Sequence, residues 1–351
     1  MARTILDIGG RLVGSGQACF IIAEAGVNHN GSLARALDLV RAAAACGADA
    51  VKFQSFRAEE VASAGAPKAA YQVANTGGGQ GQLQMLGGLE LSPDDHQAIL
   101  KQCQASGIMF LSTAFDARSV DLLDSLGVPA FKVPSGEITN LPLLRHIASM
   151  RKPIILSTGM STLEEVGQAL EALREALPQG IVLLHCVSNY PAQPRDVNLR
   201  AMATMAQAFG LPVGYSDHTL GLEVPLAAVA LGACVIEKHL TLDRGLPGPD
   251  HAASAEPQEL AALVKGARVV EAALGQGGKE PAASEANTRQ VARRSLVAEV
   301  DIPAGVVITP GMIAIKRPGT GLPPASLDQV LGRRTRVAIG AGTLLGMEML
   351  A

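Results

Sequence analysis

Two histidines stand near the ends of neighbouring apolar runs in the sequence, and their spacing suggests a metal site. His218 ends the run PVGYSDH at 212–218, and His239 lies one residue before the end of CVIEKHL at 234–240. If the two runs are adjacent strands of one sheet, both imidazoles can point to the same position above it. Two neutral imidazoles, completed by water or substrate oxygens, would form an open site for Mn²⁺, Mg²⁺ or Co²⁺. The alternative interpretation is a pair of hydrogen-bonded histidines with a structural role only.

Six other apolar runs also end in polar residues. The polar residues at the eight ends are Glu24; Lys52 and Gln54; Ser112 and Thr113; Lys132, Ser135 and Glu137; Ser157 and Thr158; His185; Ser216 and His218; Lys238 and His239. Lys52 and Lys132, with hydroxyls such as that of Thr113, could bind a phosphate group. A single lysine of this kind is as readily explained by a solvated surface position, but the whole set predicts a polar pocket for a phosphorylated anion.

The remaining histidines are weaker ligand candidates. His185 lies inside an apolar run and is more typical of a packed core, and His251 follows the main pair at a less suitable position. We expect His29, His96 and His146 on loops or on helix surfaces.

Eight short β-like runs alternate with Ala- and Leu-rich stretches of helical periodicity. The runs are 19–26, 48–54, 108–113, 130–136, 153–159, 181–187, 212–218 and 234–240. Helix starts are indicated by Ser32, by Ser92 with Asp95, and by Ser161 with Glu164. Eight apolar strands alternating with helices predict a closed (β/α)₈ barrel over residues 1–275, with its chemistry at the carboxyl ends of the strands.

Three segments depart from this pattern. Residues 55–91, including TGGGQGQ at 76–82, are predicted to form a long loop, and such loops are usually functional or mobile. Residues 276–290 are polar and are predicted to be a linker. Residues 291–351 combine short strands with many Gly and Pro residues, which predicts a small separate domain.

The composition argues against several classes of protein. The chain has 351 residues, of which 48% are hydrophobic, and a formal net charge of −3. Without long runs of either charge, nothing indicates a nucleic-acid groove or a membrane-binding surface. The five cysteines show no CxxC spacing, and no apolar run reaches the roughly 18 residues of a membrane span. We therefore expect a cytoplasmic protein that binds a small ligand.

Several segments of the chain resemble the sialic acid synthase family. They include IIAEAGVNHNGS, FKVPSGEITNLPLL, PIILSTGMSTLEE, VGYSDHTLG, EKHLTLDRGLPGPDH and, late in the chain, KRPGTG. The resemblance extends over essentially the whole chain and includes a C-terminal module of the antifreeze-like (SAF) type. It implies an enzyme that condenses phosphoenolpyruvate with N-acetylmannosamine or a related acylated sugar and releases phosphate.

The resemblance also implies roles for individual residues. His218 and His239 would bind a divalent metal ion, for which Mn²⁺ is expected ahead of Mg²⁺ or Co²⁺. Glu24 would act as an acid/base or orient water, and Glu137 would orient the sugar or a neighbouring group. Glu24 could also be a buried partner of Lys52 or Lys132, with or without the catalytic role. Phosphoenolpyruvate would be bound by Lys52, Thr113, Lys132, Ser135, Ser157, Ser216 and either Ser188 or Asn189. The sugar would contact Gln54, Tyr190, Asp250 and, from the SAF domain of a partner subunit, Arg317. This last contact implies a domain-swapped homodimer.

Three alternatives stay open on the sequence alone. The stretches APKAAYQ at 66–72 and GYSDHTLGLEVPLAA resemble the branch of the family that makes legionaminic acid from a 2,4-diacetamido-trideoxymannose. A Schiff-base aldolase would form an imine through Lys52, Lys132 or Lys238, would be trapped by borohydride and would ignore chelators. A non-catalytic ice-binding protein would need a flat, regular face, which the charged C-terminal module does not suggest.

Overall fold

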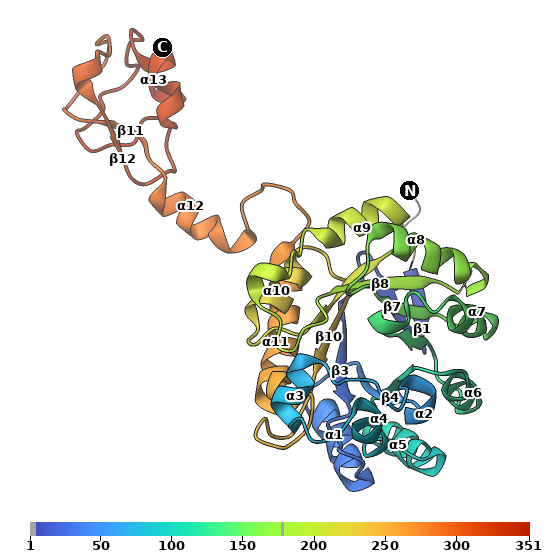
Figure 1. The fold of residues 1–351 in the computed structure, drawn as a ribbon. Helices are drawn as coiled ribbons and strands as arrows, with labels where there is room; N and C mark the ends of the chain where they lie inside the picture. The colour runs from blue at the N-terminus through green and yellow to red at the C-terminus, as the bar shows by residue number, and fades with distance from the viewer. Residues whose placement is uncertain (1–4, 177–178) are drawn as a thin grey trace. The chain divides into compact units, whose positions relative to one another are not determined.

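A closed barrel of eight parallel strands lies at the centre of the larger of two compact units, Met1–Gly275. The computed structural model describes residues 5–176 and 179–351. Each strand pairs with its neighbours in the chain, and the last closes the ring on the first (Figure 1). The strands are β3 (Phe20–Gly26), β4 (Ala50–Ser55), β5 (Met109–Ala114), β6 (Phe131–Val133), β7 (Ile154–Ser157), β8 (Ile181–Cys186), β9 (Val213–Asp217) and β10 (Val235–His239). The predicted (β/α)₈ barrel is confirmed.

A main helix follows each barrel strand and covers the outside of the barrel (Figure 1). These helices are α1 (Leu33–Ala45), α5 (Pro93–Ser106), α6 (Ala117–Ser125), α7 (Leu141–Ser149), α8 (Leu163–Ala172), α9 (Ala201–Phe209), α10 (Glu223–Ala230) and α11 (Pro257–Leu274). Their buried apolar residues pack with outward-facing strand residues such as Phe53 and Tyr215 in one continuous core. This burial is the main favourable contribution to the stability of the barrel.

The helix starts follow local capping rules. Ser32 accepts a hydrogen bond from the first turn of α1, and Ser92 forms a capping box with Asp95 at the start of α5, as predicted. The box predicted at α8 is off by one residue, because Thr162 and Glu165 form it. Both Thr and Ser can cap a helix, so the sequence alone left two registers open.

The inside of the barrel changes from apolar to polar along the strands. Alternate residues of a strand face the same side, so Leu111 and Thr113 on β5 both point inward, as do Val235 and Glu237 on β10. The inward apolar residues near the strand starts form a core of their own. The inward residues nearer the carboxyl ends are charged or carry hydroxyl groups. The chemistry is thereby confined to one end of the barrel.

A two-stranded hairpin covers the other end of the barrel. Strands β1 (Ile5–Ile8) and β2 (Arg11–Gly14) pair antiparallel before the first barrel strand. Leu6, Ile8 and Val13 are buried in the same core as the apolar strand starts. The hairpin therefore seals the amino-terminal end of the barrel.

The segment between β4 and α5 is not the single loop that was predicted. It contains three short helices, α2 (Ala58–Val61), α3 (Ala70–Thr76) and α4 (Gln82–Gly87). Val27, Phe56, Met85 and Leu89 form a separate small apolar cluster in this region. The cluster gives the segment a core that the helical and strand periodicities did not reveal.

The smaller unit, Gln276–Ala351, has its own apolar core. It contains α12 (Ala286–Ala292), the antiparallel pair β11 (Ser295–Ala298) and β12 (Ile313–Lys316), and the short helix α13 (Leu327–Val330). Part of the predicted linker, residues 276–290, is thus helical. In the described parts of the chain, every helix is too short or too polar to cross a membrane.

Candidate active site at the carboxyl end of the barrel

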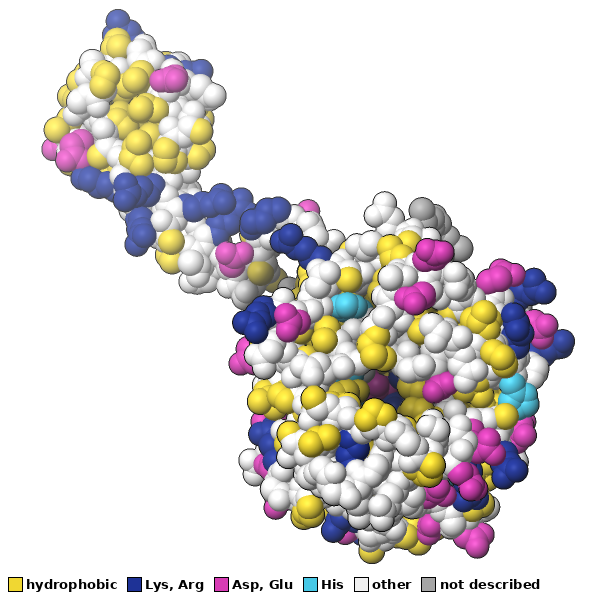
Figure 2. Space-filling view, in the orientation of Figure 1, with side chains coloured by type: hydrophobic (Ala, Val, Ile, Leu, Met, Phe, Trp, Pro, Cys, Tyr) yellow, Lys and Arg dark blue, Asp and Glu magenta, His cyan; other side chains and the backbone are white. Residues whose placement is uncertain are grey.

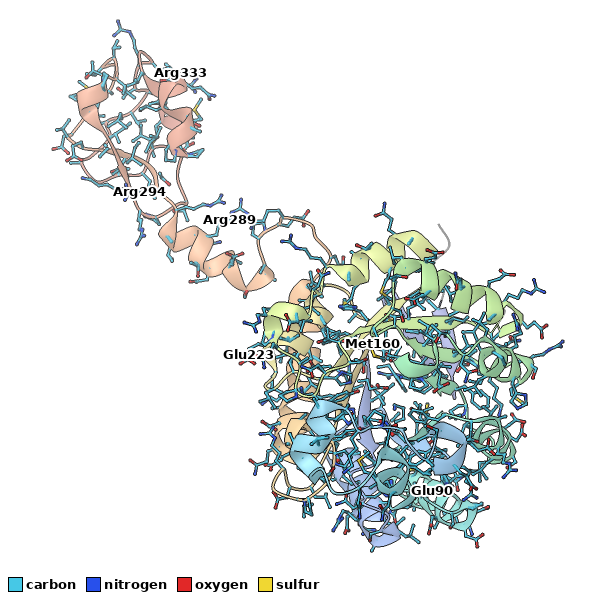
Figure 3. All side chains as sticks on the ribbon, in the orientation of Figure 1. Glu90, Met160, Glu223, Arg289, Arg294 and Arg333 are labelled. Carbon is cyan, nitrogen blue, oxygen red and sulfur yellow. The ribbon has the colours of Figure 1, made fainter. Side chains whose placement is uncertain are left out.

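A cavity of about 410 Å³ opens at the carboxyl ends of the barrel strands. The space-filling view shows a hollow in this part of the barrel, with basic and acidic side chains visible at its floor (Figure 2). Met160, which is 73% exposed, lies at its edge (Figure 3). Thirteen of the residues singled out in the sequence line the cavity: Glu24, Lys52, Gln54, Thr113, Lys132, Ser135, Ser157, Ser188, Tyr190, Ser216, His218, His239 and Asp250.

Two buried lysines stand at the floor of the cavity, each about 3% exposed. Lys52 Nζ donates a hydrogen bond to Thr113 Oγ1 at 2.7 Å, and Lys132 Nζ donates to Ser157 Oγ at 2.8 Å. Burial lowers the pKa of Lys132, against the opposing charge of Glu237. Cations and hydroxyl groups arranged in this way can hold a compact anion such as a phosphate.

Glu237 lies between the two lysines and was missed in the sequence. Its carboxylate oxygens are 3.7 Å from the ammonium groups of Lys52 and Lys132, and one of them accepts a hydrogen bond from Ser216 Oγ at 2.9 Å. Burial would raise the pKa of Glu237, but the two ammonium groups lower it to about 2. The carboxylate is therefore ionised and balances part of the lysine charge.

The strand alternation of β10 could have identified this residue. Val235, Glu237 and His239 are two residues apart and share one face of the strand, whereas Lys238 belongs to the other face. Lys238 is not at the cavity, contrary to the expectation from its place near the strand end. Its ammonium group forms a buried ion pair with Asp217 at 2.6 Å.

Glu24 is the second carboxylate at the floor. It lies 2.5 Å from Lys52 Nζ and accepts a hydrogen bond from Gln54 Nε2 at 3.2 Å. Burial raises its pKa to about 7, against the lowering effect of the Lys52 charge and with a further raising effect from Glu237. The two carboxyl groups thus have well-separated proton affinities, although they share the same lysine.

The two imidazoles meet as the spacing suggested, with ring centroids 5.5 Å apart. His218 Nδ1 is 2.6 Å from the carbonyl oxygen of Val187, so this nitrogen carries the proton and Nε2 keeps its lone pair. His239 Nδ1 is buried without a hydrogen-bond partner among the described residues. Burial lowers the pKa of both imidazoles, which keeps them neutral.

These properties fit a divalent metal ion. Neutral imidazoles with free lone pairs are its usual nitrogen ligands, and a buried nitrogen without a partner is otherwise costly. Within residues 5–176 and 179–351, no group of three or more His, Cys, Asp or Glu side chains is arranged for a metal. A metal at His218 and His239 would therefore take further ligands from water or substrate.

An aromatic stack forms one side of the cavity. Tyr190 packs on His218 with ring centroids 4.2 Å apart, and Tyr71 of α3 packs on Tyr190 at 5.0 Å. Asp250 lies close by, with its carboxylate 3.8 Å from His239 Nδ1, and burial raises its pKa to about 6. Tyr71 was not a candidate in the sequence, because nothing local indicates that α3 reaches the barrel mouth.

Some candidates do not line the cavity. Glu137 lies in the turn after β6, where its carboxylate accepts a hydrogen bond from Asn140 at 2.7 Å. Asn189 is exposed and donates to the carbonyl oxygen of Pro191, so Ser188 is the one of this pair that faces the cavity. Arg317 belongs to the smaller unit, where its guanidinium group donates to the carbonyl oxygen of Ala292.

His185, His29 and His96 lie outside the cavity. His185 bonds to the carbonyl oxygen of Val197, which agrees with a packed role rather than a ligand role. His29 lies on the loop after β3 and His96 on α5, in line with the expected loop or helix positions, but both side chains are buried rather than at the surface. His96 is 2.7 Å from Ser55 Oγ, and this hydrogen bond explains how a helix histidine can face the barrel.

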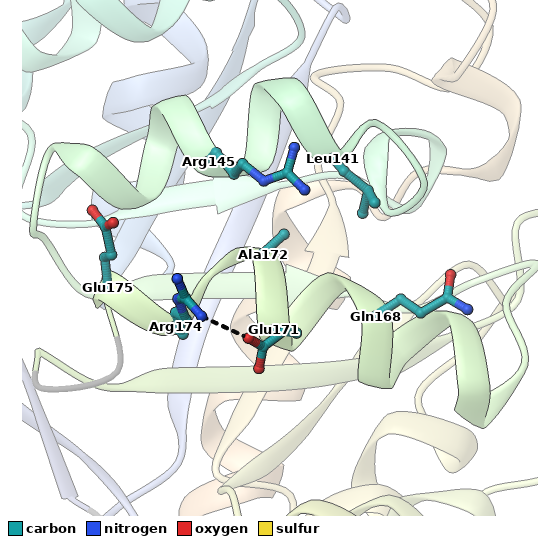
Figure 4. Close-up of a pocket in the computed structure, with 7 residues that line it drawn as sticks. All are labelled: Leu141, Arg145, Gln168, Glu171, Ala172, Arg174 and Glu175. Carbon is teal, nitrogen blue, oxygen red and sulfur yellow. Dashed lines mark hydrogen bonds and ion pairs between the residues drawn. The ribbon is translucent and has the colours of Figure 1, made fainter.

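A second cavity lies away from the strand ends, between α7 and α8 on the outside of the barrel (Figure 4). It has a volume of about 420 Å³. Arg174 and Glu171, which line it, form an ion pair at 3.0 Å with both side chains mostly exposed. An exposed pair of this kind contributes little and indicates no chemistry.

Known proteins resemble the chain over nearly its full length. The sequence profile of the NeuB family matches residues 39–279, and that of the SAF domain matches residues 293–351. The N,N'-diacetyllegionaminic acid synthase of Legionella pneumophila is 49% identical over 339 residues, which cover 95% of each chain. The N,N'-diacetyllegionaminic acid synthase of Campylobacter jejuni is 50% identical over 89% of this chain and 94% of its own. Among solved structures, the N-acetylneuraminic acid (sialic acid) synthetase of Leptospira borgpetersenii matches with a TM-score of 0.72 and 35% identity over 82% of this chain and 95% of its own.

Proposed function

Because the chain belongs to the NeuB family of phosphoenolpyruvate-dependent nonulosonic acid synthases, we propose that it is an N,N'-diacetyllegionaminate synthase. Its acceptor would be 2,4-diacetamido-2,4,6-trideoxymannose. The main support is the identity of 49% and 50% to two N,N'-diacetyllegionaminic acid synthases, against 35% to a sialic acid synthetase. N-acetylmannosamine, the acceptor first expected from the resemblance, is the second candidate.

Phosphoenolpyruvate would occupy the floor of the cavity. Lys52 and Lys132 supply two ammonium groups, and Thr113 and Ser157 are already aligned with them by hydrogen bonds. Ser135, Ser188 and Ser216 add hydroxyl groups around the same space. This set supplies hydrogen-bond donors and two cations to a phosphate and a carboxylate while the enol carbon stays free to react.

His218 and His239 would hold the divalent metal that NeuB-family enzymes generally use, and we expect Mn²⁺. When bound, the ion acts as a Lewis acid on the aldehyde oxygen of the open-chain sugar. The neighbouring protein groups orient the two imidazoles: Val187 fixes the proton of His218, and Tyr190 packs on its ring.

The reaction forms a C–C bond and a C–O bond from water, and it breaks the C–O bond that joins C2 to phosphate. C3 of phosphoenolpyruvate bonds to the aldehyde carbon, and the aldehyde oxygen gains a proton. Water adds at C2 and loses a proton, which leaves a hydroxyl group on a tetrahedral carbon. The C2–O bond to phosphate then breaks, the hydroxyl proton passes to the departing phosphate, and a 2-keto acid is left. The aldehyde oxygen takes up one proton and the attacking water releases one, so a single acid/base group near both atoms can serve both transfers.

Glu24 is our candidate for this acid/base role. It faces the cavity beside Lys52 and is oriented by Gln54. Glu137 is a weaker candidate for a role at the substrates because it does not line the cavity. Besides Glu24, the glutamate that lines the cavity is Glu237. Glu237 is held by two lysines and a serine, which suits a role in positioning the lysines rather than in moving protons.

The sugar would lie between the imidazoles and the mouth. Gln54, Tyr190 and Asp250 line this part of the cavity and offer groups for its hydroxyl and amide functions. We further propose that Arg317 of a partner subunit's SAF domain binds the acyl group of the sugar in a domain-swapped homodimer. Sedimentation analysis, together with activity of Arg317→Ala mixed with Lys52→Ala, tests this point: complementation in mixed dimers is expected, and its absence together with a monomeric mass contradicts it.

A phosphate-release assay tests the proposed function. Purified protein with Mn²⁺ and phosphoenolpyruvate would be offered the 2,4-diacetamido-trideoxymannose, N-acetylmannosamine and the altrose isomer of the diacetamido sugar. We expect the highest kcat/KM with the first, and a 2-keto acid product confirmed by mass spectrometry. A higher kcat/KM with N-acetylmannosamine would instead identify a sialic acid synthase. Trapping by borohydride with a keto acid, without sensitivity to chelators, would indicate the Schiff-base aldolase.

A further inference from the structure

We propose that an apolar wall of the cavity selects an acceptor sugar whose terminal carbon is a methyl group. The apolar wall consists of Val61, Met85, Leu86 and Leu89, all from the segment between β4 and α5. This inference rests on the proposed function and assigns the choice of substituent at C6 to named residues.

The position of the apolar wall relative to the sugar follows from where the two reacting carbon atoms must lie. The aldehyde carbon must lie beside the imidazoles of His218 and His239 and above the phosphoenolpyruvate held by the lysines. The remaining carbons of the sugar then extend toward the mouth, because the floor is occupied. The segment with α2, α3 and α4 contributes lining residues to the cavity, and Tyr71 of α3 links it to the imidazoles by packing on Tyr190.

Three of the four wall residues are held in place by a small apolar core, whereas Val61 is 37% exposed. Met85 and Leu89 are buried together with Val27 and Phe56, and Leu86 packs against this cluster. Because apolar side chains pack behind these residues, no polar side chain among the described residues lies there to contact the ligand. A methyl group placed there gains apolar burial, whereas a hydroxyl group loses water without gaining a partner.

The charges of the cavity agree with this choice. Among the described lining residues, the only lysine or arginine side chains are Lys52 and Lys132, and both are engaged with carboxylates at the floor. A phosphate on the terminal carbon would therefore meet no cation of the barrel. The polar residues of the same segment, Tyr71, Gln72 and Gln82, are neutral and suit the amide of an acetamido substituent.

The test compares two acceptors that differ in one oxygen atom. They are 2,4-diacetamido-2,4,6-trideoxymannose and its 6-hydroxy analogue, assayed by phosphate release on the same preparation. We expect the wild-type enzyme to prefer the deoxy sugar by about 10- to 100-fold in kcat/KM, the range for a hydroxyl group in an apolar pocket. Leu86→Asn, which keeps the branched shape of the side chain, should reduce this preference about tenfold, and Val61→Thr about threefold.

Val73→Thr is the matched control. Val73 is an exposed valine of α3 that does not line the cavity, so its variant should keep the wild-type preference. Val61 is also partly exposed, so Val61→Thr remains informative if Leu86→Asn fails to fold. A preference unchanged within twofold in Val61→Thr and in any folded Leu86→Asn would overturn the inference. Failure of the proposed function is distinct, because the wild-type enzyme would then turn over neither diacetamido sugar.

Discussion

The ring of Tyr190 lies on the imidazole of His218, with centroids 4.2 Å apart and planes inclined by 38°. The same tyrosine meets His239 edge-on at 5.4 Å. One aromatic side chain thus contacts both candidate metal ligands and forms part of the cavity wall. The orientation of the imidazoles therefore depends on a residue from a different loop.

Replacing Tyr190 tests this dependence. We expect Tyr190→Ala to weaken Mn²⁺ binding by about 10- to 100-fold, the usual effect of losing a group that orients metal ligands. Tyr190→Phe keeps the ring and should bind Mn²⁺ like the wild type. Calorimetric titration without substrates measures this directly. Equal affinities in Tyr190→Ala and the wild type would show that the stack does not orient the ligands.

The metal assignment itself is tested by His218→Ala and His239→Ala. Each variant should lose Mn²⁺ binding and at least about a thousandfold in kcat, since Lewis-acid activation contributes several kcal/mol. Thermal unfolding should stay within a few degrees of the wild type. Chelator treatment of the wild type, with recovery on adding Mn²⁺, is the companion measurement. Retention of full activity in either variant would refute the assignment.

Removing the charge of Glu237 should destabilise the floor of the cavity. In Glu237→Gln, Lys52 and Lys132 lose the carboxylate between them, and breaking a buried pair typically costs about 3–5 kcal/mol. We expect a lower free energy of unfolding in urea, with a larger gain from added inorganic phosphate than in the wild type. Glu223→Gln, at an exposed carboxylate of α10 (Figure 3), should change stability by less than about 1 kcal/mol. Equal stabilities for the two variants would contradict this account.

At Gly159, beside the proposed phosphoenolpyruvate site, there is no room for a side chain. A Cβ atom at this position would lie 2.4 Å from Ser188 Oγ and 2.9 Å from Ser135 Oγ. Gly159→Ala should therefore displace both hydroxyl groups and raise KM for phosphoenolpyruvate by about tenfold or more, equivalent to one good hydrogen bond. Gly167→Ala, in the middle of α8, makes only an ordinary contact with Phe209 and should instead stabilise the helix by about 0.5–1 kcal/mol. An unchanged KM in Gly159→Ala would show that the loop can shift without loss.

Acid should destabilise the barrel through His29. Burial lowers the pKa of this imidazole to about 4, so the unfolded chain binds its proton at a higher pH than the folded chain does. The contribution of neutral His29 to the free energy of unfolding is complete above about pH 6.5. It is lost as the pH falls toward 4, by about 2 kcal/mol at pH 5. Urea unfolding from pH 7.5 to 5 should show this loss, and His29→Asn should reduce it. His146→Asn, at a partly exposed histidine of α7 that is paired with Asp121, is the control, and identical pH slopes in both variants would contradict the prediction.

Much of the fold was predictable because its signals are local. Eight apolar runs with intervening helical periodicity are enough for the barrel, and Ser32 and Ser92 mark two of its helix starts. The hairpin at 5–14 and the helices within 55–91 were not predicted, because they are short and depend on contacts with distant residues. Met85, for example, is buried only because Val27 and Phe56 meet it there.

The candidate site divides in the same way. Strand-end position correctly brought His218 and His239 together, but it does not tell which residues of a strand face inward. Lys238 and Glu237 are adjacent in sequence, and only the alternation of β10 assigns the cavity to Glu237. Tyr71 could not be found locally, since its place depends on how α3 packs against Tyr190.

Among the described residues, the hairpin of β1 and β2 closes the amino-terminal end of the barrel, and the cavity lies at the carboxyl end. The apolar side chains of Leu6, Ile8 and Val13 block the amino-terminal end, so both substrates would enter the cavity from the carboxyl end of the barrel. With phosphoenolpyruvate at the floor, as proposed, the sugar would block its exit and its entry. On that proposal, the sugar would bind after phosphoenolpyruvate, and phosphate would be released only after the sugar acid.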